Sequence, residues 1–185
     1  MSRVLMAGIV LPALLASQVA VAGSWSLGSH LSLSTIRSER PGSGSSTVFA
    51  WPSNAFTYQP ALRVGLSGES RAHELLIDSG LFALDQAGST LSLFTATASY
   101  QHSFRAGSRT APIVNAGAGL YREGGAVLSS TSSTFGVGAG IRHVVGDRKG
   151  TLRAEFRYDR LHSDNALGRP ALNFVSLRLG FDLWL

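Results

Sequence analysis

The chain has 185 residues, a formal net charge of +5 and no cysteine. This length fits one domain, and the absence of cysteine excludes a disulfide framework. The basic balance alone suggests acidic partners, whose nature depends on the compartment in which the chain works.

The first 22 residues have the pattern of a cleaved secretory signal peptide. Arg3 supplies a positive start, residues 4–19 form an apolar run, and Ala20-Val21-Ala22 is a small-x-small cleavage site. A membrane anchor is the alternative, but the run is short for a span of ~20 residues. We therefore predict a signal peptide over 1–22 and a folded domain over 23–185. For an exported chain, anionic lipid or lipopolysaccharide phosphate is a more natural counter-charge than nucleic acid.

Apolar and polar residues then alternate in eight segments, a pattern typical of strands with one apolar and one polar face. In chain order these segments are 24–33, 58–67, 73–78, 93–100, 114–121, 135–142, 152–159 and 173–185. The connections between them alternate between short (68–71, 105–110 and 146–149) and longer (36–57, 80–89, 122–131 and 161–172). Within 36–57, the run Pro41-Gly42-Ser43-Gly44 and Pro52 are expected to break regular structure.

Short turns at one end and longer loops at the other are typical of a bacterial outer-membrane barrel. We predict an all-β fold: an eight-stranded antiparallel up-and-down transmembrane β-barrel, integral to the outer membrane. An even number of strands places both chain ends on the periplasmic side, where the short turns also fall.

The distribution of charge decides which face of the predicted strands lies inside. A soluble barrel has an apolar interior, whereas a membrane barrel has a polar one. The polar faces carry five cations and five anions, and the apolar faces carry almost no charge. Such a balance is expected in a narrow interior, because an unpaired buried charge costs several kcal/mol. The predicted interior set is Arg63, Glu74, Asp78, Arg142, Arg153, Glu155, Arg157, Asp159, Arg178 and Asp182.

The last strand resembles the C-terminal assembly signal of outer-membrane β-barrel proteins. That pattern combines a polar residue, a glycine and two hydrophobic residues, and Arg178, Gly180, Leu183 and Leu185 fill it. Leu185 is the one departure, because an aromatic residue is commoner there. Together with Phe181, these residues are predicted to be the signal that the barrel assembly machinery reads. More generally, the chain resembles the small OmpA/OmpX-type barrels.

Residues 162–166 read His-Ser-Asp-Asn-Ala and resemble a region of the outer-membrane lipid A deacylases, which carry His-x-Ser-Asn-Ala. The resemblance implies ester hydrolysis by a serine nucleophile with a histidine base, and the candidates are His162 and Ser163. The nucleophile position itself falls on Asp164, however, and the acid position falls near Asn173. In a continuing strand His162 and Ser163 would point to opposite sides, although a bulge could bring them together.

Other kinds of site are less well indicated. The five histidines lack close ligand spacing, so we predict no metal and no other cofactor. Arg37 and Arg40, followed by several aromatic residues, could contact glycan or lipopolysaccharide in the first long connection. Aromatic residues near the periplasmic strand ends are expected at the membrane interface: Trp25, Tyr100, Phe104 and Trp184.

The leading prediction for function is a structural or surface-interaction protein with external loops and a plugged interior. Its expected partners are outer-membrane lipid, lipopolysaccharide and the barrel assembly machinery, and the sequence does not indicate an external ligand. One alternative is a lipid A esterase or a catalytically lapsed relative. A second alternative is a narrow ion channel along the arginine-rich interior. The balance of these observations favours a protein without enzymatic activity.

Overall fold

The computed structural model describes residues 23–53, 61–86, 89–124, 129–147, 149–165 and 168–185. The predicted signal peptide lies outside the described residues. Nine strand segments are present in these ranges: β1 (Ser24–Ser38), β2 (Ser45–Ser53), β3 (Ala61–Ser67), β4 (His73–Gln86), β5 (Ser89–Ser103), β6 (Thr110–Gly124), β7 (Ser129–Val145), β8 (Gly150–Leu161) and β9 (Leu172–Trp184). All neighbouring segments pair antiparallel, and β9 pairs with β1 to close the sheet.

The nine segments form an eight-stranded barrel, because β2 and β3 occupy successive parts of one strand position. β3 pairs with the start of β1, from Ser24 opposite Ser67 to Gly28 opposite Arg63. β2 pairs with the remainder of β1, as far as Arg37 opposite Ser45. The predicted fold class, a closed eight-stranded antiparallel barrel, is therefore confirmed.

The prediction of irregular structure over 36–57 was wrong for 36–38 and 45–53, whereas 39–44 form a turn; 54–57 lie outside the described residues. β1 continues to Ser38, and residues 45–53 return beside it as β2. Strand formation here is favoured by β-branched residues such as Thr47 and Val48. Pro52 is accommodated because it lies where the register with β1 shifts, between the partners of His30 and Ser32, and proline is tolerated at bulges and on edge strands.

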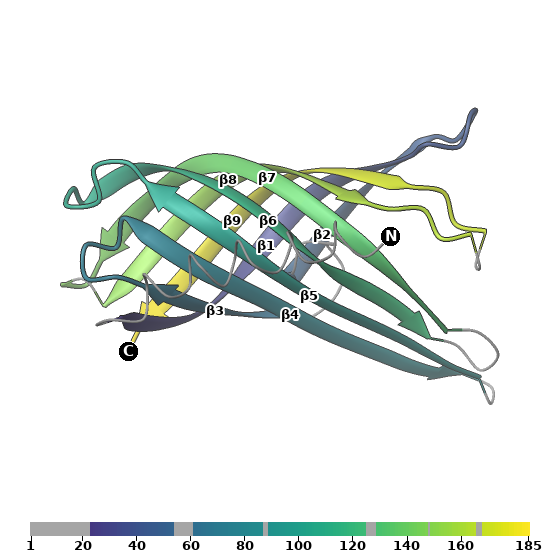
Figure 1. Cartoon of the computed structure of the whole chain (residues 1–185), viewed down its shortest axis with the longest axis horizontal. Helices are drawn as coiled ribbons and strands as arrows, with labels where there is room; N and C mark the ends of the chain where they lie inside the picture. Colours follow the sequence, from purple (N-terminus) through teal and green to yellow (C-terminus); the bar gives the residue numbers. More distant parts are fainter. Residues whose placement is uncertain (1–22, 54–60, 87–88, 125–128, 148, 166–167) are drawn as a thin grey trace, which may run out of the picture.

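The two ends of the barrel differ in how the strands are connected (Figure 1). One end, here named the terminal end, holds Ser24, Leu185 and the short turns over 68–72, 104–109 and 146–149. The opposite end, named the loop end, holds the β1–β2 hairpin and the β8–β9 connection, which project beyond the barrel wall in Figure 1. Among the described residues, no helix is long and apolar enough to cross a membrane.

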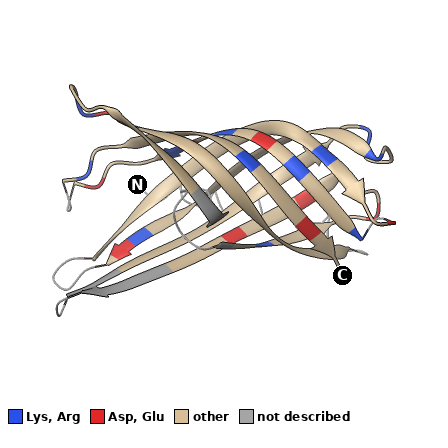
Figure 2. Cartoon of the chain, turned by 180° about the vertical axis from the view of Figure 1, so that it is seen from behind, with Lys and Arg blue, Asp and Glu red and all other residues tan. Residues whose placement is uncertain are grey.

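The two faces of the barrel wall are chemically opposite. Large hydrophobic side chains are exposed on the outer face, on every strand position: examples are Trp25, Leu62, Ile77, Phe94, Val114, Val137, Phe156 and Leu177. The buried side chains inside are mostly polar or charged, and Figure 2 shows basic and acidic positions side by side on neighbouring strands. This inverted arrangement suits a wall surrounded by hydrocarbon.

Candidate functional site

The structure places all ten residues of the predicted interior set inside the barrel, each with at most 5% of its surface exposed. The period-two alternation of the strands turns each of these side chains inward. The strands that carry them are β3, β4, β7, β8 and β9. The interior is therefore a compact array of charges drawn from elements far apart in the sequence.

Glu74 on β4 is the centre of the first charge cluster. Its carboxylate accepts hydrogen bonds from Arg153 Nη2 at 2.8 Å, from Arg142 Nη1 at 3.3 Å and from Gln101 Nε2 at 2.6 Å. Arg153 also donates through Nε to Asp182 at 2.5 Å and through Nη1 to Gln101. Charge-assisted hydrogen bonds of this kind are the strong ones, and here they connect five strands across the interior.

Two further groups continue the charge array. Arg63 and Asp78 form a bidentate pair between β3 and β4, at 2.8 and 3.2 Å. Arg157 donates to Asp159 at 2.9 Å and lies 3.7 Å from a Glu155 oxygen. Arg178 donates to the other oxygen of Asp159. Every arginine of the interior set thus has at least one carboxylate partner, which offsets the cost of burying it.

Glycines opposite the carboxylates make room for this array. Gly136 pairs across the strands with Asp159, and an added Cβ there would lie 1.8 Å from an Asp159 oxygen. Gly28 pairs with Asp182, and its added Cβ would lie 2.2 Å from that carboxylate. Because Gly136 and Gly28 have no side chain, the carboxylates of the adjacent strands have room beside them.

Towards the loop end the interior holds a cluster of apolar side chains. Leu93, Tyr121, Leu161 and Phe174 form one buried cluster, with Ile36 and Leu172 packed against it. The four core members are at most 6% exposed. The side chains come from β5, β6, β8 and β9, so the cluster joins four strands inside the barrel.

Near the terminal end, Trp184 is buried inside the barrel. Its indole Nε1 donates to Thr151 Oγ1 at 2.8 Å, and the Arg71 guanidinium lies over the ring at 4.2 Å from the centroid. The expectation that Trp184 lies at the membrane interface was therefore wrong. Alternation explains the inward position, because Trp184 shares the face of Asp182.

The projecting segments of the loop end are held together by Glu39. Its carboxylate pairs with Arg160 at 2.5 Å and accepts from Asn173 Nδ2 at 3.4 Å, and its backbone N–H donates to Ala171 at 3.0 Å. These contacts tie the β1–β2 hairpin to the β8–β9 connection. Beside them, Arg37 and other residues of the hairpin line a cavity of about 590 Å³.

The candidate catalytic residues, His162 and Ser163, have different surroundings. His162 is exposed, and its Nδ1 lies 3.0 Å from Ser133 Oγ and 3.2 Å from the Ser133 carbonyl oxygen. Ser163 is exposed at the start of the β8–β9 connection. Asp164 turns inward instead, where it accepts hydrogen bonds from Ser130 and Ser132. The serine that contacts His162 is thus on β7, outside the segment that resembles the deacylases.

Comparisons with known proteins identify the architecture. No protein-family model and no curated protein matches the sequence. Neisserial surface protein A has a similar solved structure, with a TM-score of 0.63 and 18% identity over 88% of this chain and 98% of that one. The fold is that of the small outer-membrane β-barrels. The same comparison returns, at a TM-score of 0.45, Ail of Yersinia pestis (11% identity, 89% of this chain and 100% of that one) and OprG of Pseudomonas aeruginosa (10% identity, 89% and 96%).

The barrel has interior residues that the sequence did not single out. Gln101 belongs to the first charge cluster, Asn115 accepts a 2.5 Å hydrogen bond from Arg157, and Leu76 is 1% exposed. Each lies on the inward face of its strand. The same alternation that predicted the inward charges could therefore have predicted these residues as well. In the described part of the chain, no group of three or more His, Asp or Glu residues is arranged to hold a metal ion.

Proposed function

We propose that the chain is an integral protein of a bacterial outer membrane that serves as a scaffold and presents its loop end for interactions outside the cell. The observation that supports this proposal is the content of the interior: paired charges lie inside the barrel, and a buried apolar cluster that includes Leu93 and Phe174 lies near the loop end. A wall that is apolar outside and filled inside suits an anchor better than a conduit.

The loop end supports an interaction role because its segments are ordered relative to each other. Glu39 joins the β1–β2 hairpin to the β8–β9 connection, so both present one surface. The exposed Arg37 and Arg40 beside the 590 Å³ cavity offer guanidinium groups to anionic ligands. Phosphate or carboxylate groups of lipopolysaccharide or of a surface glycan have the complementary chemistry.

Cysteine labelling tests this orientation directly, because the natural chain contains no cysteine. Ser43→Cys in the β1–β2 hairpin and Ser108→Cys in the β5–β6 turn are matched exposed serines at opposite ends. A membrane-impermeant maleimide should label Ser43→Cys on intact cells and Ser108→Cys only after the outer membrane is opened. Labelling of both variants on intact cells, or recovery of the chain without detergent, would contradict the proposal.

A lipid A esterase is the second candidate, and the contact between His162 and Ser133 favours it. Lipid A from cells that express the protein should keep its mass if the barrel is a scaffold. Loss of one acyl chain would instead indicate the esterase, and the Ser133→Ala and Ser163→Ala variants would identify which serine is required.

The third candidate is an ion channel, which requires a path past the paired charges and the apolar cluster. Planar bilayers that contain the purified barrel should therefore remain silent. Reproducible conductance steps would favour the channel over the scaffold.

A further inference from the structure

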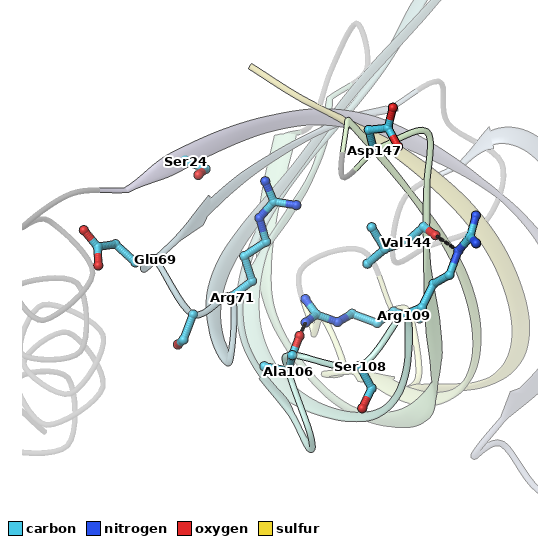
Figure 3. Close-up of a pocket in the computed structure, with 11 residues that line it drawn as sticks. Ser24, Glu69, Arg71, Ala106, Ser108, Arg109, Val144 and Asp147 are labelled. Atoms are coloured by element: carbon cyan, nitrogen blue, oxygen red, sulfur yellow. Dashed lines mark hydrogen bonds between the residues drawn. The ribbon is translucent and has the colours of Figure 1, made fainter.

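The terminal end contains a cavity of about 600 Å³, a size typical of small-molecule sites. All three short turns contribute to its lining, and Figure 3 shows how they surround it. The lining residues include three arginines and three serines: Arg71, Arg109, Arg142, Ser24, Ser70 and Ser108. Glu69 and Asp147 also line it, but Glu69 points away from Arg71 in Figure 3.

The arginines are placed there by contacts already described or by backbone carbonyl groups. Arg71 lies over the buried ring of Trp184. Arg109 Nε donates to the Val144 carbonyl at 3.2 Å, and Arg142 Nη2 donates to the Ala106 carbonyl at 3.1 Å. The guanidinium groups of Arg109 and Arg142 are therefore oriented by carbonyl oxygens. These acceptors are neutral, so the two contacts do not neutralise the positive charge of the arginines.

Arg142 has the weakest charge compensation of the first cluster. It is 1% exposed, its contact with Glu74 is 3.3 Å long, and its Nε has no hydrogen-bond partner among the described residues. Glu74 is shared with Arg153, which approaches to 2.8 Å and has Asp182 as a second carboxylate. An additional anion near Arg142 would neutralise the part of its positive charge that the shared Glu74 carboxylate does not.

The sequence concentrates positive charge at the same end. The three short turns carry five cations and two carboxylates, whereas the interior set is balanced. The cations are Arg71, Arg105, Arg109, Arg148 and Lys149, and the carboxylates are Glu69 and Asp147. Among the residues that line the cavity, three arginines outnumber two carboxylates, and a cleft with an excess of one charge attracts the opposite ion.

We propose that the terminal-end cavity binds a phosphate group, with Arg71 and Arg109 at its rim and Arg142 at its floor. Guanidinium forks match phosphate oxygens in geometry, and the serine hydroxyls supply further donors. The group could belong to a soluble phosphate ester or to a phospholipid headgroup, which share this chemistry. The site is independent of any activity at the loop end.

The test uses the full folded barrel in a maltoside detergent, which contains no phosphate. Inorganic phosphate is titrated against chloride at equal ionic strength, and the NMR resonance of the Trp184 indole N–H is followed because Arg71 lies on that ring. We expect a saturable shift with phosphate. Arg71→Gln should weaken the affinity about tenfold, whereas Arg122→Gln, in β6 towards the loop end, should leave it unchanged.

Two results would overturn the site: an equal response to chloride, or an unchanged affinity in Arg71→Gln. The source of the phosphate is tested by repeating the titration in nanodiscs of phosphatidylcholine with and without phosphatidylglycerol. Loss of the phosphate response in either nanodisc, relative to maltoside, indicates a lipid headgroup, and loss only with phosphatidylglycerol indicates an anionic headgroup. An unchanged response in both indicates a soluble phosphate ester.

Discussion

Replacement of Glu74 by glutamine is the sharpest test of the interior charge array. The substitution keeps the shape of the side chain but removes the one carboxylate that Arg142 and Arg153 share, at 3.3 and 2.8 Å. Glu74 is 0% exposed, so water cannot replace the lost charge. Opposite charges ~4 Å apart attract by about 4 kcal/mol at an effective dielectric constant of ~20.

The expected loss of unfolding free energy is about 3–5 kcal/mol, the usual cost of removing one partner of a buried ion pair. A matched control is Glu39→Gln, which breaks a partly exposed pair with Arg160 and should cost at most about 1 kcal/mol. The double variant Glu74→Gln/Arg142→Gln restores the charge balance. It should be more stable than the sum of its single variants by about 1–3 kcal/mol.

Urea unfolding in detergent, followed by tryptophan fluorescence and by the heat-modifiable migration of the folded barrel, measures the wild type, the three single variants and the double variant. The reasoning is refuted if Glu74→Gln costs no more than Glu39→Gln. It is also refuted if the double variant is strictly additive, because the two side chains would then not be coupled.

Three further substitutions test other features. Gly136→Ala should cost about 1–3 kcal/mol by overpacking against Asp159, and Gly44→Ala, which meets nothing within 4 Å, should be neutral in the same unfolding assay. Leu177→Arg, on the exposed apolar face, should cost about 2–4 kcal/mol near the membrane midplane; normal amounts of folded barrel in the membrane would contradict a lipid-facing position. Asp164→Asn should weaken the contacts that hold the β8–β9 connection and speed its proteolysis, while the barrel itself keeps its heat-modifiable migration.

Much of the architecture could be predicted from the sequence because a strand has a period of two. The alternation around Arg153, Glu155 and Arg157 predicts three inward side chains without any knowledge of their partners. The prediction failed over 45–53, where proline and small residues obscured β2. It failed there because the ladder with β1 stabilises a segment whose local sequence is ambiguous.

The pairing of the interior charges could not be predicted in the same way. Glu74 and Arg153 are 79 positions apart in the chain and lie on strands that are not neighbours. The contact between His162 and Ser133 depends likewise on the register of β7 and β8, in which Thr134 lies opposite Leu161. Registers are set by the closure of the whole sheet, so local patterns predict the inward face but not the neighbours on it.

The position of Asp182 has a consequence for the order of assembly. Arg153 reaches one carboxylate on β4, made early, and another on β9, the last strand to be synthesised. An unfinished barrel without β9 would therefore hold a half-neutralised arginine and an open edge on β1. Both defects disappear when β9 docks, because the second carboxylate reaches Arg153 at the same time as the sheet closes. Partly assembled chains therefore remain less stable until β9 is in place.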